Sequence, residues 1–194
     1  MIYTRGRTGS ELLIDLLRSN PTLVCEGEIL GGRVPAPRLW VRAHATGAAR
    51  AGAVAYGFKT LYTDLGRVQK VDPSAFLRHL SDQGYLIVHL VRRNLLRQAV
   101  SWLQATQQQT HYRDSTERSS YKPVRFDPET LIAVMLEAEY IREVERERLQ
   151  GLPHVTVSYE EDLLDASRHQ ATADAVFQAR VFDAALAAGE KPLP

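Results

Sequence analysis

The chain has few cysteines, little net charge and no long apolar run, and each of these absences excludes a class of protein. It has one cysteine in 194 residues, which rules out a disulfide within the chain and suits a reducing compartment. Its formal net charge is +1, so no broad surface for nucleic acid is expected and any anion site must be local. No apolar run approaches the roughly 18 residues of a membrane span, and no leader segment is visible. The sequence therefore predicts a cytoplasmic protein with no membrane span and no nucleic acid partner.

The motifs of two common enzyme classes are also missing. The six histidines are scattered, and no cluster of His, Cys and Asp has the spacing of a metal site, so no metal is expected. The chain lacks the Gly-x-x-x-x-Gly-Lys-Ser/Thr motif, whose lysine holds the terminal phosphates of a nucleoside triphosphate. A P-loop kinase for small molecules is thereby disfavoured.

The rest of the composition is that of an ordinary globular protein, with 24% charged and 44% hydrophobic residues. The length suits a single domain over residues 1–194, and no linker or internal repeat divides the chain. Residues 166–194 are atypical, because they are rich in alanine and end in Gly-Glu-Lys-Pro-Leu-Pro.

Short segments rich in Val, Ile, Leu and Tyr alternate with helical patterns along the chain. Strands are predicted at 1–4, 23–26, 53–59, 85–91 and 154–159, and helices near 9–19, 73–83, 94–107, 128–150 and 171–188. Residues 31–52 are predicted to form a helix with loops, or a flap. Two helix starts have Asp followed by Pro, at 72–73 and 127–128. The alternation predicts a three-layer α/β fold with a mostly parallel sheet of about five strands and helices on both faces.

A glycine-containing turn joins the first strand to the first helix. It reads Arg-Gly-Arg-Thr-Gly-Ser-Glu over residues 5–11. The N–H groups at a helix start point outward and the helix dipole favours negative charge there, so the turn is a candidate anion cradle. The alternative is a capping box without a ligand, in which Thr8 is the N-cap and Glu11 the N3 residue.

Three segments together resemble a known enzyme family. Residues 7–13 read Arg-Thr-Gly-Ser-Glu-Leu-Leu, residues 25–30 form a short acidic segment, and Arg93 at a strand end precedes Ser101 by eight positions. In this order the segments resemble the sulfotransferases that use PAPS (3′-phosphoadenosine 5′-phosphosulfate). The nearest likeness is to bacterial carbohydrate sulfotransferases of the nodulation and trehalose type, which implies a P-loop-like version of the predicted fold.

The resemblance implies roles for the residues that match. The 5′-phosphosulfate of PAPS would be held by Arg7, Thr8, Gly9, Ser10 and Glu11. The 3′-phosphate would be bound by Arg93 and Ser101, with Arg92 as the runner-up for the arginine. PAPS would be the co-substrate and PAP, its desulfated form, the product.

A glutamate and a lysine complete the predicted site. Glu28 is preferred as the general base over Glu26, because Glu26 falls within the strand whereas Glu28 follows it after Gly27. Lys59 is expected to neutralise charge near the sulfuryl group or to pair with Glu28. Ligands of open α/β sheets bind outside the carboxyl ends of the strands, where these residues and the two arginines are predicted.

The leading hypothesis is therefore a sulfotransferase that moves a sulfuryl group from PAPS to a hydroxyl of a carbohydrate-containing or other small-molecule acceptor. A shortened relative that binds PAP or PAPS without catalysis is the second hypothesis, because the tail does not match the family. A kinase is the third. The helical pattern near 128–150 also permits a homodimer.

Overall fold

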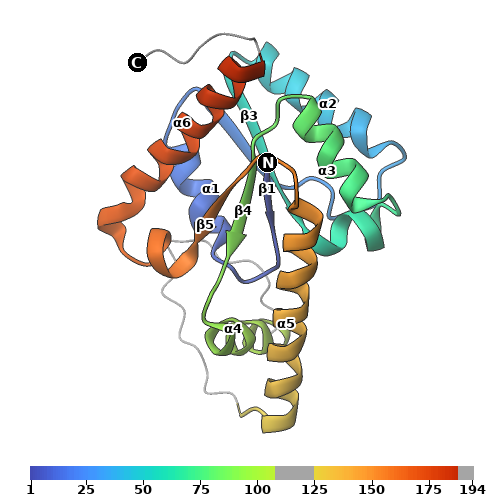
Figure 1. Cartoon of the computed structure of the whole chain (residues 1–194), viewed down its shortest axis with the longest axis vertical. Coiled ribbons are helices and arrows are strands. Elements are labelled where there is room, and N and C mark those ends of the chain that lie inside the picture. The colour runs from blue at the N-terminus through green and yellow to red at the C-terminus, as the bar shows by residue number, and fades with distance from the viewer. Residues whose placement is uncertain (108–124, 188–194) are drawn as a thin grey trace.

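The computed structural model describes residues 1–107 and 125–187 and shows one parallel sheet between two layers of helices (Figure 1). The five strands lie in the order β2-β3-β1-β4-β5, and every pair is parallel. They are β1 (Ile2–Thr4), β2 (Leu23–Glu28), β3 (Ala55–Leu61), β4 (Ile87–Val91) and β5 (His154–Ser158). The predicted three-layer α/β fold is confirmed, and its arrangement is P-loop-like.

Helices connect the strands, as the alternating pattern predicted. They are α1 (Ser10–Arg18), α2 (Pro37–Arg50), α3 (Pro73–Asp82), α4 (Leu95–Gln107), α5 (Pro128–Leu149) and α6 (His169–Ala187). The π-helical turns η1 (Asp64–Val68) and η2 (Tyr159–Leu163) and the 3₁₀ turn η3 (Ala166–Arg168) complete the described elements. Both Asp-Pro helix starts are confirmed, since Asp72 and Asp127 each accept a hydrogen bond from a backbone N–H of the first turn.

Each face of the sheet has its own hydrophobic core. On one face, Leu13, Ile14 and Leu17 of α1 and Val176 of α6 pack on the strands. On the other face, the strands meet side chains of α2, α3 and α5, including Val41, Phe76 and Leu149. The strands are short and mostly buried, as parallel strands covered on both sides are expected to be.

Helix α4 lies across the end of the sheet where the parallel strands finish (Figure 1). It packs on α5 through a small cluster that contains Ala99, Leu103 and Val134. All the loops that follow the strands therefore emerge next to α4, and this edge of the sheet is where a ligand is expected.

Residues 166–187, which the sequence marked as atypical, form η3 and α6, and residues 188–194 lie outside the described part. Across the described ranges, the helices are too short or too polar to cross a membrane.

Candidate functional site

A cavity of about 1100 Å³ opens at the carboxyl edge of the sheet. The loop after β1, the ends of β2 and β3, helix α4 and Tyr159 of η2 contribute to its wall. The wall includes the following residues predicted from the sequence: Arg7, Gly9, Ser10, Glu11, Glu28, Lys59 and Ser101. Segments from residue 7 to residue 101 of the chain are thus brought to one place.

The loop after β1 is held by its hydroxyl groups and not by a capping box. Thr8 is buried, and its Oγ1 lies 2.7 Å from Thr4 Oγ1 and donates to the carbonyl of Arg5 at 3.0 Å. The N-cap of α1 is Gly9, and the side chain of Glu11 turns to Lys59. The capping-box alternative is therefore wrong, because Thr8 faces back to β1 and Glu11 has a charged partner elsewhere.

Gly9 is required by its conformation and by its neighbour. Its φ is +89°, and a Cβ at this position would overlap the ring of Tyr159. Arg7, two residues earlier, also has a positive φ of +66°. The loop thus turns sharply beneath Tyr159 and places Ser10 at the start of α1, facing the cavity.

Lys59 is buried between two carboxylates at the cavity wall. Its side chain is 4% exposed, and its Nζ lies 2.9 Å from Glu28 Oε1 and also pairs with Glu11. Burial by itself lowers the pKa of Lys59, but the hydrogen bonds to Glu11 and Glu28 outweigh it and hold that pKa above its usual value. Lys59 is therefore a fixed positive charge, and it orients both glutamates.

A β-bulge separates the two candidate glutamates of β2. Glu26 is paired with Phe58 and Glu28 with Lys59, so Gly27 is the extra residue. Phe58 and Lys59 are consecutive in β3, so their side chains point to opposite faces of the sheet, and the glutamates paired with them do the same. The two glutamates therefore have different surroundings. Glu26 Oε2 contacts His44 Nδ1 at 2.7 Å and accepts from the Tyr56 hydroxyl at 2.5 Å.

The preference for Glu28 over Glu26 agrees with this placement, since Glu28 lines the cavity and Glu26 is engaged with α2 and β3. The expected strand end is wrong by two residues. The strand β2 runs to Glu28, because the bulge lets pairing with β3 continue past Gly27.

Ser101 lies against the loop and not at a distance from it. Arg7 Nε donates to Ser101 Oγ at 3.1 Å. Arg92 Nη1 donates to the carbonyl of Arg7 at 3.1 Å, and its guanidinium carbon lies 4.6 Å from the centroid of the Tyr159 ring. The end of β4 and helix α4 therefore support the loop after β1.

Arg93 is placed apart from these groups. Among the described residues, Arg92 lines the cavity and Arg93 does not. The side chain of Arg93 pairs with Glu161, and its backbone N–H donates to Glu160 Oε2 at 2.9 Å. The assignment of Arg93 to the 3′-phosphate stays a prediction, and the runner-up Arg92 is the arginine that the structure brings to the cavity.

Glu160 fixes the turn that carries both arginines. Its Oε1 accepts from the N–H of Asn94 at 3.0 Å, next to the bond from Arg93 N–H. Burial alone would raise the pKa of Glu160, but these backbone hydrogen bonds lower it below its usual value. The same turn also contributes Tyr159 to the cavity wall.

Several wall residues were not predicted from the sequence. They include Asp15, Arg97, Trp102, Gln104 and Tyr159, together with apolar side chains such as Leu96. Asp15 lies four positions after Glu11 in α1, and Arg97 lies four positions before Ser101 in α4, so helical periodicity would have pointed to them. The Tyr159 contact depends on the fold alone.

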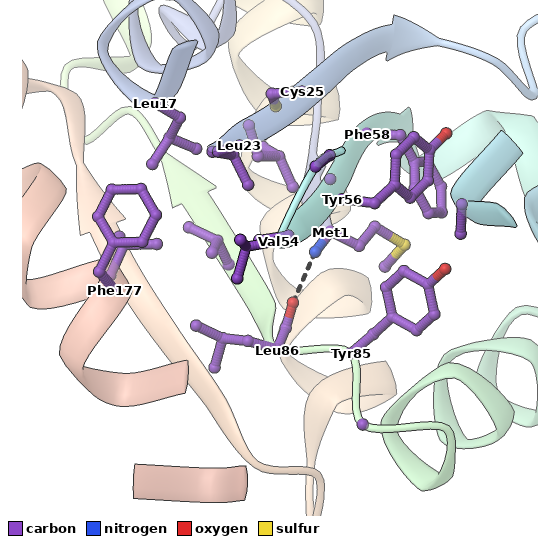
Figure 2. Close-up of a pocket in the computed structure, with 18 of the residues that line it drawn as sticks. Met1, Leu17, Leu23, Cys25, Val54, Tyr56, Phe58, Tyr85, Leu86 and Phe177 are labelled. Atoms are coloured by element: carbon purple, nitrogen blue, oxygen red, sulfur yellow. Dashed lines mark hydrogen bonds between the residues drawn. The ribbon is translucent and has the colours of Figure 1, made fainter. Parts of the chain in front are cut away.

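A second cavity, of about 280 Å³, lies at the opposite, amino edge of the sheet (Figure 2). Its wall is mostly apolar, with Leu17, Leu23 and Phe58, and the amino group of Met1 donates to the carbonyl of Leu86 at 2.6 Å beside it. None of the residues predicted to act in catalysis or binding lines it. The charged side chains predicted to act in catalysis or binding therefore lie at the carboxyl edge and not at the amino edge.

Within residues 1–107 and 125–187, no three His, Cys, Asp or Glu side chains are grouped so as to hold a metal ion. A comparison with models of known protein families gave no match, and a comparison with curated proteins gave none either.

Proposed function

We propose that the chain is a PAPS-dependent sulfotransferase that acts on a hydroxyl of a small-molecule or carbohydrate-containing acceptor. One observation carries the proposal. The glycine loop after β1, the Glu28–Lys59 pair and Ser101 line a single cavity at the carboxyl edge of the sheet.

The spacing of the anion-binding groups supports a nucleotide with two phosphate groups on one ribose. Substituents at the 3′ and 5′ positions of the same sugar are close neighbours. Ser101 hydrogen-bonds to Arg7 of the loop, so the group that binds one phosphate lies beside the group that binds the other. Arg92 adds a second guanidinium to the same wall.

In the proposed reaction, the acceptor oxygen attacks the sulfur of PAPS in line with the bridging oxygen. The new O–S bond forms as the bond from sulfur to the bridging oxygen breaks, and PAP leaves with the electron pair. Glu28 takes the proton of the acceptor hydroxyl. The loop amides and Arg7 stabilise the charge that builds on the leaving phosphate, and this kind of stabilisation is worth about 3–4 kcal/mol per donor in enclosed sites.

Lys59 has two roles in this scheme. Its charge offsets that of the sulfuryl oxygens, and its 2.9 Å contact orients the Glu28 carboxylate toward the acceptor. Glu11 holds Lys59 from the other side, so the lysine keeps its position when Glu28 becomes protonated during turnover.

The second candidate is a relative that binds PAP without catalysis. A small-molecule kinase is less favoured, because the loop lacks the P-loop lysine and β4 is followed by Arg92 and Arg93, where an aspartate for Mg²⁺ would be expected. Tight PAP binding in the absence of Mg²⁺ would favour either of the first two over a kinase.

Transfer of labelled sulfate from PAPS to a panel of hydroxyl acceptors tests the proposal. We expect turnover in the unaltered chain and a loss of 10²-fold or more in Glu28→Gln, the scale at which general bases contribute. The matched control is Glu26→Gln, which makes the same change two positions away and outside the cavity. PAP affinity should be retained in both variants.

Each outcome has a clear meaning. PAP binding without transfer to any acceptor would support the non-catalytic relative. Full turnover in Glu28→Gln would refute the role of Glu28 as general base, but it would still support the sulfotransferase activity. Absence of PAP binding by calorimetry would refute the proposal.

A further inference from the structure

The ring of Tyr159 lies against the backbone of the loop after β1. Tyr159 is the first residue of η2, directly after β5, and it is partly buried. A Cβ at Gly9 would lie 2.8 Å from Cε2 of this ring and closer still to Cδ2. The ring therefore fills the space that the missing side chain of Gly9 leaves, and only glycine lets it come so near to the loop.

The same ring supports the guanidinium group of Arg92. The guanidinium carbon lies 4.6 Å from the ring centroid, within the range of a cation–π contact. Arg92 Nη1 donates to the carbonyl of Arg7 at 3.1 Å, and Arg92 Nε lies 3.9 Å from Glu160 Oε1. The Arg92 side chain is 14% exposed, so little water surrounds the guanidinium. The contacts thus run from Gly9 through the ring to Arg92 and back to the loop at Arg7.

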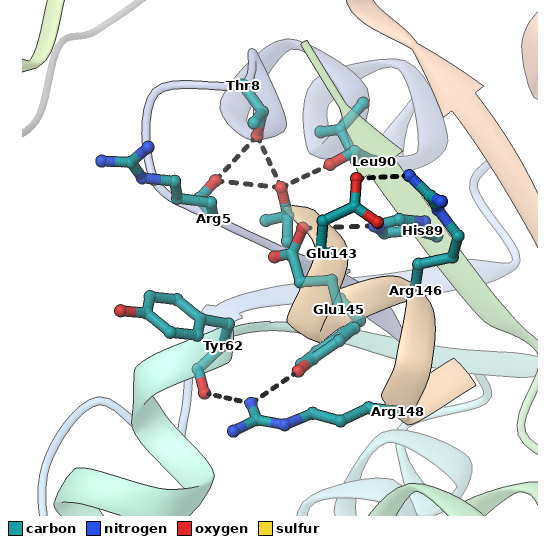
Figure 3. Close-up of polar contacts among 12 residues, drawn as sticks. Arg5, Thr8, Tyr62, His89, Leu90, Glu143, Glu145, Arg146 and Arg148 are labelled. Carbon is teal, nitrogen blue, oxygen red and sulfur yellow. Dashed lines mark hydrogen bonds and ion pairs between the residues drawn. The ribbon is translucent and has the colours of Figure 1, made fainter. Parts of the chain in front are cut away.

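Hydroxyl groups fix the loop on a different side (Figure 3). Thr4 Oγ1 donates to the carbonyl of Leu90 at 2.6 Å and lies 2.7 Å from Thr8 Oγ1, which donates to the carbonyl of Arg5 at 3.0 Å. These bonds join the start of the loop to β4. The Tyr159 ring is a separate anchor, because it belongs to the turn after β5 and lines the large cavity.

The contacts of Arg92 order its side chain before any ligand binds. An arginine that is free to change rotamer loses conformational entropy when it is fixed on an anion, and this loss weakens binding. In Arg92 the ring, the Arg7 carbonyl and the Glu160 carboxylate already limit that freedom. A guanidinium held at the cavity wall in this way is preorganised for a phosphate group.

We propose that Tyr159 is a positioning residue of the nucleotide site, whose ring holds the guanidinium of Arg92 in the orientation that binds a phosphate group of PAPS. The inference rests on the proposed function, since it takes PAPS as the ligand. The effect belongs to the ring and not to the hydroxyl, because ring atoms make the contacts with both Gly9 and Arg92. Tyr159 acts through Arg92 and does not itself bind the nucleotide.

Calorimetric titration with PAP tests the ring and Arg92 together. Tyr159→Phe keeps the ring and should bind PAP as the unaltered chain does. Tyr159→Leu removes the ring and should weaken PAP binding about fivefold to tenfold, the scale of a cation–π contact. In an Arg92→Ala background, Tyr159→Leu should change the affinity by less than about twofold, because the ring then has no guanidinium to hold. Tyr140→Leu makes the same change at an exposed side chain of α5 and should have no effect.

The outcomes separate this inference from the proposed function. Unchanged PAP affinity in Tyr159→Leu would overturn the inference alone. An equal loss in the Arg92→Ala background would do the same, because Tyr159 would then act without Arg92. A loss in Tyr159→Phe would also overturn it, because the hydroxyl would then matter. Absence of PAP binding in the unaltered chain would overturn both the inference and the proposed function.

Urea unfolding shows whether each variant is folded under the conditions of the titration. If Tyr159→Leu is not, Tyr159→Met takes its place, because methionine fills irregular space without an aromatic ring. The same loss of PAP affinity, and the same dependence on Arg92, are expected of it. Unchanged affinity in Tyr159→Met would contradict the inference.

Discussion

Arg7 and Ser101, 94 positions apart in the chain, are joined by a hydrogen bond of 3.1 Å from the guanidinium Nε to the hydroxyl oxygen. The contact brings the first turn after β1 against the second turn of α4. The two side chains therefore lie side by side on the wall of one cavity. A ligand that binds both side chains must therefore have its charged groups close together.

Ser101 is expected to contribute to nucleotide binding through one hydrogen bond to a phosphate oxygen. Loss of a hydrogen bond to a charged group costs about 1.5–3 kcal/mol, so Ser101→Ala should weaken PAP binding by about tenfold or more. Calorimetric titration with PAP measures this. Ser167→Ala, which alters an exposed residue of η3, is the control and should bind PAP as the unaltered chain does.

The two arginines after β4 are expected to differ in their contribution to nucleotide affinity. Arg92 lines the cavity, whereas the Arg93 side chain is 62% exposed and pairs with Glu161. Arg92→Ala should therefore weaken PAP binding more than Arg93→Ala in the same titration. A larger loss in Arg93→Ala would support the sequence-based assignment and would mean that this side chain leaves Glu161 when PAP binds.

Gly9→Ala should destabilise the fold, because the left-handed backbone disfavours a Cβ and the Tyr159 ring occupies its place. The conformational part alone is worth about 1–2 kcal/mol. Gly6→Ala is a matched control in the same loop, where a Cβ would meet nothing within 4 Å. Urea unfolding of both variants gives the comparison, and equal midpoints would contradict the expectation.

Tyr3 makes the stability of the fold sensitive to alkaline pH. The residue is fully buried, and burial raises its pKa to about 12 from an ordinary value of 10.0, although a hydrogen bond from Arg148 opposes the shift. The folded state thus keeps the phenol proton longer than the unfolded state. This contribution is fully present below pH 10 and is lost as the pH rises toward about 12.

Over that window the loss amounts to about 3 kcal/mol, from ~1.4 kcal/mol per pKa unit. Denaturant unfolding of Tyr3→Phe should therefore show a shallower decline of stability with pH than the unaltered chain. Tyr140→Phe, at a side chain that is 69% exposed, should leave the decline unchanged. An identical slope in Tyr3→Phe would show that other groups cause it.

The sequence predicts the architecture well because each signal is local. The Asp-Pro pairs at 72–73 and 127–128 set helix starts, and the short apolar segments place all five strands within a few residues. Residues at the carboxyl ends of these strands were expected to meet. The common cavity of Arg7, Glu28 and Lys59 agrees with that expectation, because parallel strands share one edge.

Side-chain partners were harder to predict. Thr8 and Glu11 have the spacing of a capping box, but a buried lysine 48 positions away from Glu11 is a stronger partner than a backbone N–H. Arg92 and Arg93 are adjacent, and no local rule says which of them faces the cavity. That choice depends on Glu160 and Glu161, which belong to the turn after the last strand.

The extra residue at Gly27 has a consequence for the register of the sheet. The strand β2 is an edge strand, so only β3 holds its last residues in place. If pairing slipped to a regular ladder there, Glu28 would rotate to the side of His44, and the cavity would lose an acid with no change in sequence. The position of the Glu28 carboxylate in the cavity thus depends on one β-bulge between β2 and β3. A peptide or neighbouring molecule that added a strand to the free edge of β2 would act directly on the strand that carries this bulge.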